Sequence, residues 1–218
     1  PNLQGTIGKY YALHQKESEE IALSIEEHWM PKSEGSPLPS STVGIILSLA
    51  DKLDNLTSYF SVGLKPTSSS DPYALRRQAI GIIRTLIEKQ IDLDLEIILH
   101  EASSLHPTLS NKKEIIEDVL QFITNRAKGV LEDYGFKKDE IEASLQGKCT
   151  NPYDQFRKVE ALHAFRKDPS FPDLYEVFKR SKGQLGKGSP STLHPNLLQE
   201  KAEKELFVLV ERMQKPFA

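Results

Sequence analysis

The sequence predicts an all-α fold, and three of its features support that prediction. Apolar residues recur at the three-to-four-residue spacing of amphipathic helices along almost the whole chain. Asp or Asn, followed by Pro or by an acidic residue, precedes several of these patterns, and glycines close others, as is typical of helix ends. No segment alternates apolar and polar residues with the Gly, Asn or Pro punctuation of a β-hairpin.

The composition is typical of a globular protein. The 218 residues are 38% hydrophobic and 27% charged, with a formal net charge of -3. Such a chain can bury a substantial core, and its surface cannot be basic throughout. No apolar run approaches the ~20 residues that cross a bilayer, so we expect no membrane segment. The single Cys149 cannot form an internal disulfide, which fits a reducing cytoplasm, and the start at Pro1 suggests a piece of a longer protein.

The first 41 residues are expected to form two short helices and a loop. Residues 4–13 are one candidate helix. Residues 18–29 are another, because Ile21, Ile25 and Trp29 follow one another at intervals of one helical turn. Residues 31–41 contain three prolines and a glycine and are predicted to be a loop.

Residues 42–88 are predicted to form the pair of helices around which the chain is organised. The first helix has an apolar face beside which Asp51 and Asp54 lie, and a Gly- and Pro-containing loop follows it. Asp71 and Pro72 predict the start of the second helix, as an N-cap carboxylate and a proline at the first helical position. This second helix buries its own apolar face and carries three arginines away from it: Arg76, Arg77 and Arg84.

The remainder of the chain is also expected to be helical. Residues 111–134 keep the helical period without a break, Asn111 and Glu114 resemble a capping box, and Gly135 closes the helix. Asn151 and Pro152 repeat the cap-then-proline start. A connector rich in Gly and Ser is expected at residues 183–191, and the other predicted helices are 92–103, 139–146, 152–167, 171–182 and 196–215.

A divalent metal site is one candidate for chemistry. The residue types that such a site would use are present in His14, His28, Asp51 and Asp54. The His-Asp dipeptide at the centre of helical metal phosphohydrolases does not occur in the sequence. A structural role for the two aspartates is therefore favoured, as helix caps or as partners of nearby cations.

Two other catalytic patterns are weaker. Cys149 lies between Lys148 and Thr150 with no patterned His beside it, and no Ser has the surroundings of a nucleophile elbow. Residues 183–189 are glycine-rich, but they lack the preceding strand and the spacing of a nucleotide-binding P-loop. We therefore expect an inert cysteine and a linker.

Two basic groups could contact nucleic acid. Residues 151–190 contain eight Lys or Arg against five acids, in a chain that is acidic as a whole. The three arginines of the second central helix form the other group. Either group could bind phosphates, with Tyr153 or Tyr175 free to stack on a base. The alternative, two solvated helix faces, is left open by composition alone.

Several stretches resemble the beta subunit of bacterial-type glycyl-tRNA synthetase. They occur in the same order as in that family: Leu3-Gln4-Gly5, Gly8, Tyr10-Tyr11-Ala12-Leu13-His14, Glu26-Glu27-His28, Pro31, Leu38-Pro39, Ala50-Asp51-Lys52-Leu53-Asp54, Phe60, Gly63, Pro66-Thr67, Asp71-Pro72 and Leu75-Arg76-Arg77. The resemblance is looser after residue 86. It implies a degenerate HD-like helical region at 1–106, a helical connecting region at 107–175, and the start of a helical anticodon-binding domain, cut short, at 176–218. Asp51 would match the last aspartate of the HD motif.

The resemblance also implies a function. The parent enzyme attaches glycine to tRNA(Gly) in the cytoplasm, and it is expected to be oligomeric. ATP and Mg are used by its alpha subunit or by a fused alpha portion. This fragment is expected to have no catalytic residue, no metal and no cofactor of its own. The alternatives are an HD-type metal-dependent phosphohydrolase and a purely structural scaffold.

The expected role of the fragment is to position tRNA through phosphate contacts. The candidate residues near the acceptor arm are Lys52, Lys65, Arg76, Arg77 and Arg84. Those nearer the anticodon are Arg157, Arg166, Lys179 and Arg180.

Overall fold

The computed structural model describes residues 3–33, 35–67, 70–105, 111–145, 149–184 and 198–214. These residues form ten α-helices and no strand, which confirms the all-α fold class. No helix in these ranges is long and apolar enough to cross a membrane. The helices are α1 (Thr6–His14), α2 (Glu19–Glu27), α3 (Thr42–Ser61), α4 (Leu75–Glu88), α5 (Leu95–Ser104), α6 (Lys112–Asp133), α7 (Lys138–Ser144), α8 (Pro152–Phe165), α9 (Phe171–Gln184) and α10 (Lys201–Gln214).

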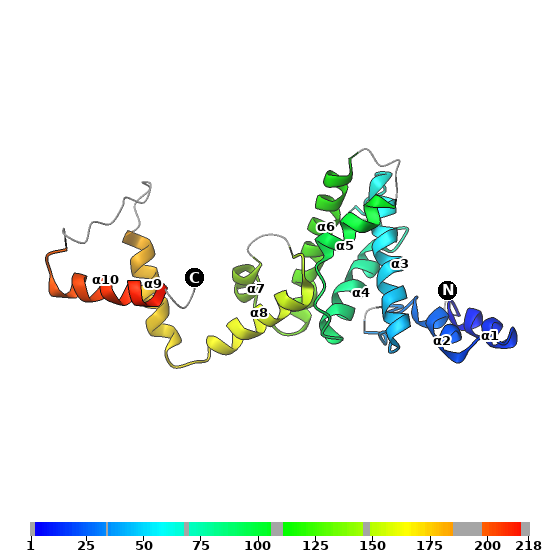
Figure 1. Cartoon of the computed structure of the whole chain (residues 1–218), viewed down its shortest axis with the longest axis horizontal. Helices are drawn as coiled ribbons and strands as arrows, with labels where there is room; N and C mark the ends of the chain where they lie inside the picture. The colour runs from blue at the N-terminus through cyan, green and yellow to red at the C-terminus, as the bar shows by residue number, and fades with distance from the viewer. Residues whose placement is uncertain are drawn as a thin grey trace. The chain divides into compact units, whose positions relative to one another are not determined.

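The chain divides into two compact units. Residues Pro1–Asp168 hold α1 to α8, and residues Pro169–Ala218 hold α9 and α10 (Figure 1). In the second unit, the apolar side chains of both helices are largely exposed, as Phe178 and Leu206 illustrate at 60% each. The three regions expected from the family resemblance, and the HD-like character of the first, remain predictions.

The core of the first unit lies among α3, α4, α5 and α6. Helix α4 packs against α3 and α6, and α5 packs against α3 and α6 (Figure 1). The fully buried side chains come from all four helices and include Leu56, Ile82, Leu86, Leu99 and Leu120. Because its apolar face is held on two sides, α4 presents its remaining face, with the arginines, in a fixed orientation.

The start of α4 differs from the prediction. The helix begins at Leu75 and not at Pro72, because Ala74 adopts a left-handed conformation with φ 54° after a turn. The Asp71 carboxylate still reaches the helix, since it accepts hydrogen bonds from the backbone N–H of Leu75 (2.8 Å) and of Arg76 (3.0 Å). Asp71 thus satisfies two of the free N–H groups of α4 from outside the usual N-cap position.

Three other predicted helix ends can be compared with the structure. Asn111 precedes α6, but its side chain makes no cap hydrogen bond, so the prediction of a capping box with Glu114 was wrong. The amide of Asn111 donates to the Glu114 carboxylate instead (3.4 Å). Asn151 is confirmed as the N-cap of α8, where it accepts from the N–H of Asp154 (3.1 Å). Gly135 is confirmed as the close of α6, with φ 91°.

The predicted connector at 183–191 was partly wrong, because Gly183 and Gln184 belong to the last turn of α9. Its other residues, which include the rest of the glycine-rich candidate loop, lie outside the described ranges, as do residues 196, 197 and 215 of the last predicted helix. Most other helix ends lie within about three residues of their predicted positions, the usual uncertainty of such boundaries.

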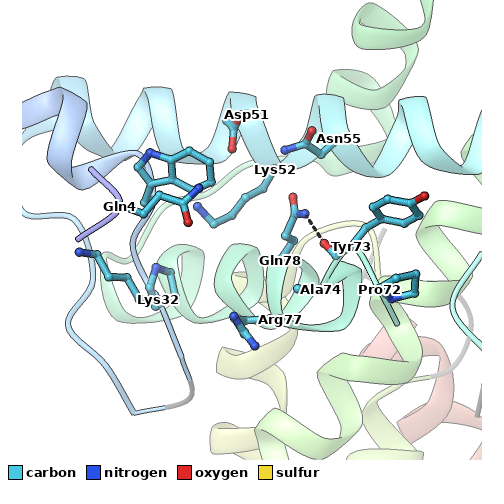
Figure 2. Close-up of a pocket in the computed structure, with 12 residues that line it drawn as sticks. Gln4, Lys32, Asp51, Lys52, Asn55, Pro72, Tyr73, Ala74, Arg77 and Gln78 are labelled. Atoms are coloured by element: carbon cyan, nitrogen blue, oxygen red, sulfur yellow. Dashed lines mark hydrogen bonds between the residues drawn. The ribbon is translucent and has the colours of Figure 1, made fainter. Parts of the chain in front are cut away.

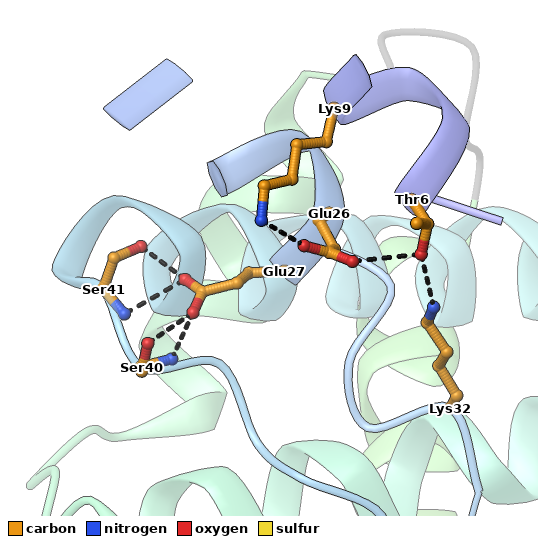
Figure 3. Close-up of polar contacts among 7 residues, drawn as sticks. All are labelled: Thr6, Lys9, Glu26, Glu27, Lys32, Ser40 and Ser41. Atoms are coloured by element: carbon orange, nitrogen blue, oxygen red, sulfur yellow. Dashed lines mark hydrogen bonds and ion pairs between the residues drawn. The ribbon is translucent and has the colours of Figure 1, made fainter. Parts of the chain in front are cut away.

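Two neighbouring carboxylates attach α2 to the segments on either side of it (Figure 3). Glu26 accepts from Lys9 Nζ (2.8 Å) and from the Thr6 hydroxyl (3.0 Å), which ties α2 to α1. Lys32 in turn lies 3.4 Å from the Thr6 hydroxyl oxygen. This chain of contacts positions Lys32 in the loop that follows α2.

Glu27 connects α2 to the start of α3. Its carboxylate is 3% exposed and accepts from the backbone N–H and the hydroxyl of both Ser40 and Ser41 (Figure 3). Burial raises the pKa of the Glu27 carboxyl, but the hydrogen bonds from the two serines outweigh that effect and leave the pKa below its ordinary value. The charged form of Glu27 therefore stabilises the folded state.

Candidate nucleic-acid interface

A polar pocket lies between α3 and α4, and we call it the α3–α4 pocket (Figure 2). Its volume is about 490 Å³. One side comes from α3, the other from α4 and the turn before it, and the end from the N-terminal residues and the loop after α2. The lining residues are Gln4, Trp29, Pro31, Lys32, Asp51, Lys52, Asn55, Pro72, Tyr73, Ala74, Arg77 and Gln78.

Lys52 is the most buried cation of this pocket. Its side chain crosses from α3 toward α4 (Figure 2), and the residue is 5% exposed. The ammonium donates to the carbonyl oxygen of His28 (2.9 Å) and to the Ser48 hydroxyl (2.7 Å), with the Ser48 carbonyl farther away at 3.4 Å. Burial lowers the pKa of Lys52 to about 8, against the opposing effect of the Asp51 charge. In the described part of the chain Lys52 forms no ion pair.

Gly81 of α4 allows Pro31 and Lys52 to approach the helix. A Cβ atom added at this buried position would lie 3.1 Å from Pro31 Cδ and 3.3 Å from Lys52 Cε. By contrast, a Cβ atom added at Gly129 of α6 would meet nothing within 4 Å. The two helical glycines therefore form a matched pair for mutation.

We expect Gly81→Ala to lower the free energy of unfolding by roughly 1 kcal/mol, because overpacking costs about 1–3 kcal/mol and the gain in helix propensity is about 1 kcal/mol. Gly129→Ala should raise the same quantity by about 0.5–1 kcal/mol, since only the propensity changes. Urea unfolding followed by circular dichroism measures both. Equal stabilisation by the two alanines would show that Pro31 and Lys52 do not pack tightly on α4.

A second hollow lies next to the α3–α4 pocket, and we call it the arginine groove. Its volume is about 430 Å³, and it shares Pro31, Ala74 and Arg77 with the pocket. Arg76, Arg77 and Arg84 all line it, together with one acid, Asp71. The structure thus brings together the three arginines of the second central helix that the sequence identified as a basic group.

The three arginines differ in how freely they can take a new partner. Arg77 is exposed and has no side-chain partner among the described residues. Arg76 donates to the Thr67 carbonyl oxygen, which is uncharged. The guanidinium of Arg84 already pairs with Glu88 (2.9 Å), and its side chain is only 17% exposed. A phosphate in the groove would therefore find Arg77 most available and Arg84 least.

Lys65 lies near this region but is already engaged. Its ammonium pairs with Asp118 of α6 and lies 5.9 Å from the centre of the Phe60 ring. It lines a smaller hollow of about 140 Å³ beside Thr67, Asp71 and Pro72. Lys65 therefore borders the turn that leads into α4, outside the arginine groove.

The four basic residues predicted on the anticodon side lie on α8, at its C-cap and on α9. Arg157 stacks over the Tyr153 ring at 5.9 Å, and Arg166 pairs with Asp139 (2.7 Å) and Glu140 (3.2 Å). Because these two arginines are nine residues apart, they project from opposite faces of α8. On α9, Arg180 pairs with Glu176 (2.7 Å), whereas Lys179 is exposed without a described partner. These residues line neither the α3–α4 pocket nor the arginine groove.

The candidate metal ligands are not brought together in the described ranges. No group of three or more His, Cys, Asp or Glu side chains there could hold a metal ion. The His28 Nδ1 atom lies 2.7 Å from the Ile25 carbonyl oxygen, and Asp51 lines the α3–α4 pocket. Cys149 is buried, and burial raises the pKa of its thiol to about 12, so it stays protonated near neutral pH.

Sequence reasoning did not identify several polar residues of the pocket, among them Gln4, Lys32, Asn55 and Gln78. Lys32 follows a proline in an irregular loop, and Asn55 and Gln78 are ordinary residues of helical patterns. Nothing in their local sequence distinguishes them, because they meet only when α3, α4 and the loop pack together. The helical spacing does place Asn55 one turn from Asp51, which is the one signal that could have grouped them.

Comparisons with known proteins agree with one another. A family model described as glycyl-tRNA synthetase beta subunit matches residues 1–146. The glycine–tRNA ligase beta subunit of Syntrophomonas wolfei is 36% identical over 209 residues, which cover 94% of this chain and 30% of the relative. The beta subunit of Pseudomonas aeruginosa is 39% identical over 209 residues, which cover 94% of this chain and 31% of the relative. The beta subunit of Methylobacillus flagellatus is 39% identical over 217 residues, which cover 98% of this chain and 31% of the relative. The chain thus spans less than a third of the length of these relatives.

Proposed function

Because this chain belongs to the glycyl-tRNA synthetase beta subunit family, we propose that it binds and positions tRNA for the attachment of glycine. It acts as part of a larger enzyme in the cytoplasm. The chemical steps, which use ATP and Mg, belong to an alpha subunit or to a fused alpha portion. The contribution of this chain is to hold the RNA in place.

The arginine groove is the observation that supports this role best. Three arginines line a concave surface whose one acid, Asp71, already accepts two backbone hydrogen bonds. Guanidinium groups are well suited to phosphate because their planar fork can form two parallel hydrogen bonds. The chain as a whole is slightly acidic, so this surface is a local exception and can select where RNA docks.

The groove sits on a rigid support, which matters for positioning. Helix α4 is buried through Ile82, Ile83 and Leu86, each 0% exposed. The arginines are therefore fixed relative to the core, and a bound phosphate would be fixed with them. Contacts of this kind set the register of an RNA but carry no base specificity.

A second set of contacts is proposed on the anticodon side, through Arg157, Arg166, Lys179 and Arg180. Lys179 is the most available of these, because the described structure gives it no partner. In this proposal Arg76, Arg77 and Arg84 contact the tRNA nearer the acceptor arm. The anticodon-side residues are divided between the two units, since Arg157 and Arg166 belong to the first and Lys179 and Arg180 to the second. Lys52 is enclosed in the α3–α4 pocket, so it can meet only a group that enters that pocket.

The test is the salt dependence of tRNA binding. Nitrocellulose filter binding of tRNA(Gly) between about 50 and 200 mM salt should give a slope of log K against log salt of roughly -3 to -6, since each of the phosphates neutralised by these residues contributes about -0.7 to -0.9. A non-cognate tRNA should bind with similar affinity, because phosphate contacts do not read sequence. Absence of binding at the lowest salt would contradict the proposal and favour a purely structural scaffold.

A further inference from the structure

The α3–α4 pocket has an excess of positive charge that its one acid balances only in part. Lys32, Lys52 and Arg77 line it, and Asp51 is its one acid. Lys52 is almost fully buried, and its hydrogen bonds go to the uncharged oxygens of His28 and Ser48. A buried charge without a counter-ion is costly. An anion of about two negative charges, such as a phosphate monoester, would complement the pocket.

The ammonium of Lys52 can accommodate such an anion without losing its structural contacts. Its bonds to the His28 carbonyl and the Ser48 hydroxyl are 2.9 and 2.7 Å long, but the Ser48 carbonyl lies 3.4 Å away. The N–H group directed at this last, weakest acceptor is the one that would most readily donate a hydrogen bond to a ligand oxygen instead. The two short bonds then keep Lys52 in place while it binds.

Other groups of the pocket suit the organic part of a nucleotide. The Oε1 atom of Gln78 is buried with no hydrogen-bond partner, although its Nε2 atom donates to the Tyr73 carbonyl oxygen (3.2 Å; Figure 2). A buried acceptor of this kind calls for a donor, which a ribose hydroxyl or a base amino group supplies and a fully ionised phosphate does not. Asn55 extends from α3 on the other side of the pocket and offers both a donor and an acceptor (Figure 2).

Size and shape agree with a ligand larger than an ion. The volume of about 490 Å³ lies within the range of about 300–1,000 Å³ that is typical of small-molecule sites. Trp29 and Tyr73 line the pocket and are 39% and 42% exposed, so each has ring surface on which a base can stack.

From these contacts we infer that the α3–α4 pocket binds a nucleoside phosphate. The phosphate lies against Lys52, Lys32 and Arg77, the sugar or base donates to Gln78, and the base stacks on Trp29 or Tyr73. The nucleotide can be free in solution or part of an RNA, since the chemistry of recognition is the same. The site is separate from the phosphate contacts of Arg76 and Arg84 in the arginine groove.

Isothermal titration of the full chain with AMP, GMP, adenosine and inorganic phosphate tests this inference. At least one nucleotide should bind saturably, and both adenosine and phosphate alone should bind at least about tenfold more weakly, since each keeps only part of the contacts. Absence of saturable nucleotide binding would overturn the inference, as would binding of phosphate as tight as that of the nucleotides.

Two charge-changing substitutions test whether the net positive charge of the pocket favours nucleotide binding. Asp51→Asn removes the one acid, is nearly isosteric, and should tighten nucleotide binding by about threefold to tenfold, while Lys32→Gln should weaken it by a similar factor. A metal-dependent or cation-binding pocket would give the opposite result for Asp51→Asn, and that result would overturn the inference. Thermal unfolding of each variant shows whether the fold is retained.

Two further measurements separate this pocket from the arginine groove and identify the source of the nucleotide. The double variant Arg76→Gln/Arg84→Gln should keep the nucleotide affinity of the unmodified chain, whether or not its tRNA affinity falls. Competition between tRNA(Gly) and the nucleotide would identify the ligand as a nucleotide of the RNA, and independent binding would identify a free nucleotide. Both outcomes support the site. Loss of nucleotide binding in the double variant would overturn its assignment to the α3–α4 pocket.

Discussion

Replacing Arg76, Arg77 and Arg84 together with glutamine is expected to weaken tRNA binding by about two to three orders of magnitude at ~50 mM salt, because up to three phosphate contacts are lost. The slope of log K against log salt should become less steep by roughly 2 to 3 for the same reason. Filter binding with tRNA(Gly) measures both quantities. The fold should be retained, since none of the three arginines belongs to the buried core residues of α4.

The three single Arg→Gln variants should not weaken tRNA binding equally. Arg77→Gln should have the largest effect, because Arg77 has no described partner, and Arg84→Gln the smallest, because Arg84 must first give up Glu88. Lys89→Gln is the matched control, since Lys89 is exposed at the C-terminal end of the same helix and lines neither hollow. If Lys89→Gln weakened binding as much as Arg77→Gln, binding would depend on net charge and not on the groove.

The second large effect is expected at Glu27. Glu27→Ala should lower the free energy of unfolding by about 2–4 kcal/mol, because a buried carboxylate with four hydrogen bonds is lost and the backbone N–H groups of Ser40 and Ser41 lose their acceptor. Glu20→Ala on the exposed side of α2 is the control and should change the same quantity by less than about 0.5 kcal/mol. Urea unfolding gives both values.

The pH dependence of this effect has a definite sign. The pKa of Glu27 is lower in the folded state than the ordinary value, so its contribution is fully present above the unfolded-state pKa of about 4.3. That contribution is lost as the pH falls through the folded-state pKa. The difference in stability between the unmodified chain and Glu27→Ala should therefore be constant near neutral pH and shrink below about pH 4. A difference that grew on acidification would contradict the assigned role of Glu27.

Much of the fold could be predicted from the sequence, because helical periodicity reports directly which face each helix buries. The face of α4 that holds Ile82, Ile83 and Leu86 is buried as the pattern indicates. The start of α4 could not be predicted in this way, since Asp71 and Pro72 carry the usual signal of a helix start. The left-handed Ala74 is set by the tertiary position of the turn and has no local signature.

The candidate site was predictable only in part. Arg76, Arg77 and Arg84 share one helix face by spacing alone, and so their grouping was visible before the structure. The α3–α4 pocket was not visible, because its members come from segments that are distant in sequence, such as Gln4, Lys32 and Gln78. The burial of Lys52 was equally hidden, since it depends on the approach of Pro31 and Gly81.

The central claim is that the arginine face of α4 holds the tRNA backbone. Chemical modification of arginines by phenylglyoxal, read out by mass spectrometry with and without tRNA(Gly), tests it most directly. We expect tRNA to protect Arg77 most strongly and Arg76 to a lesser extent, while Arg126 of α6, which lies against the Phe122 ring, reacts equally in both samples. Unchanged reactivity of Arg76 and Arg77 in a sample that contains bound tRNA would contradict the account.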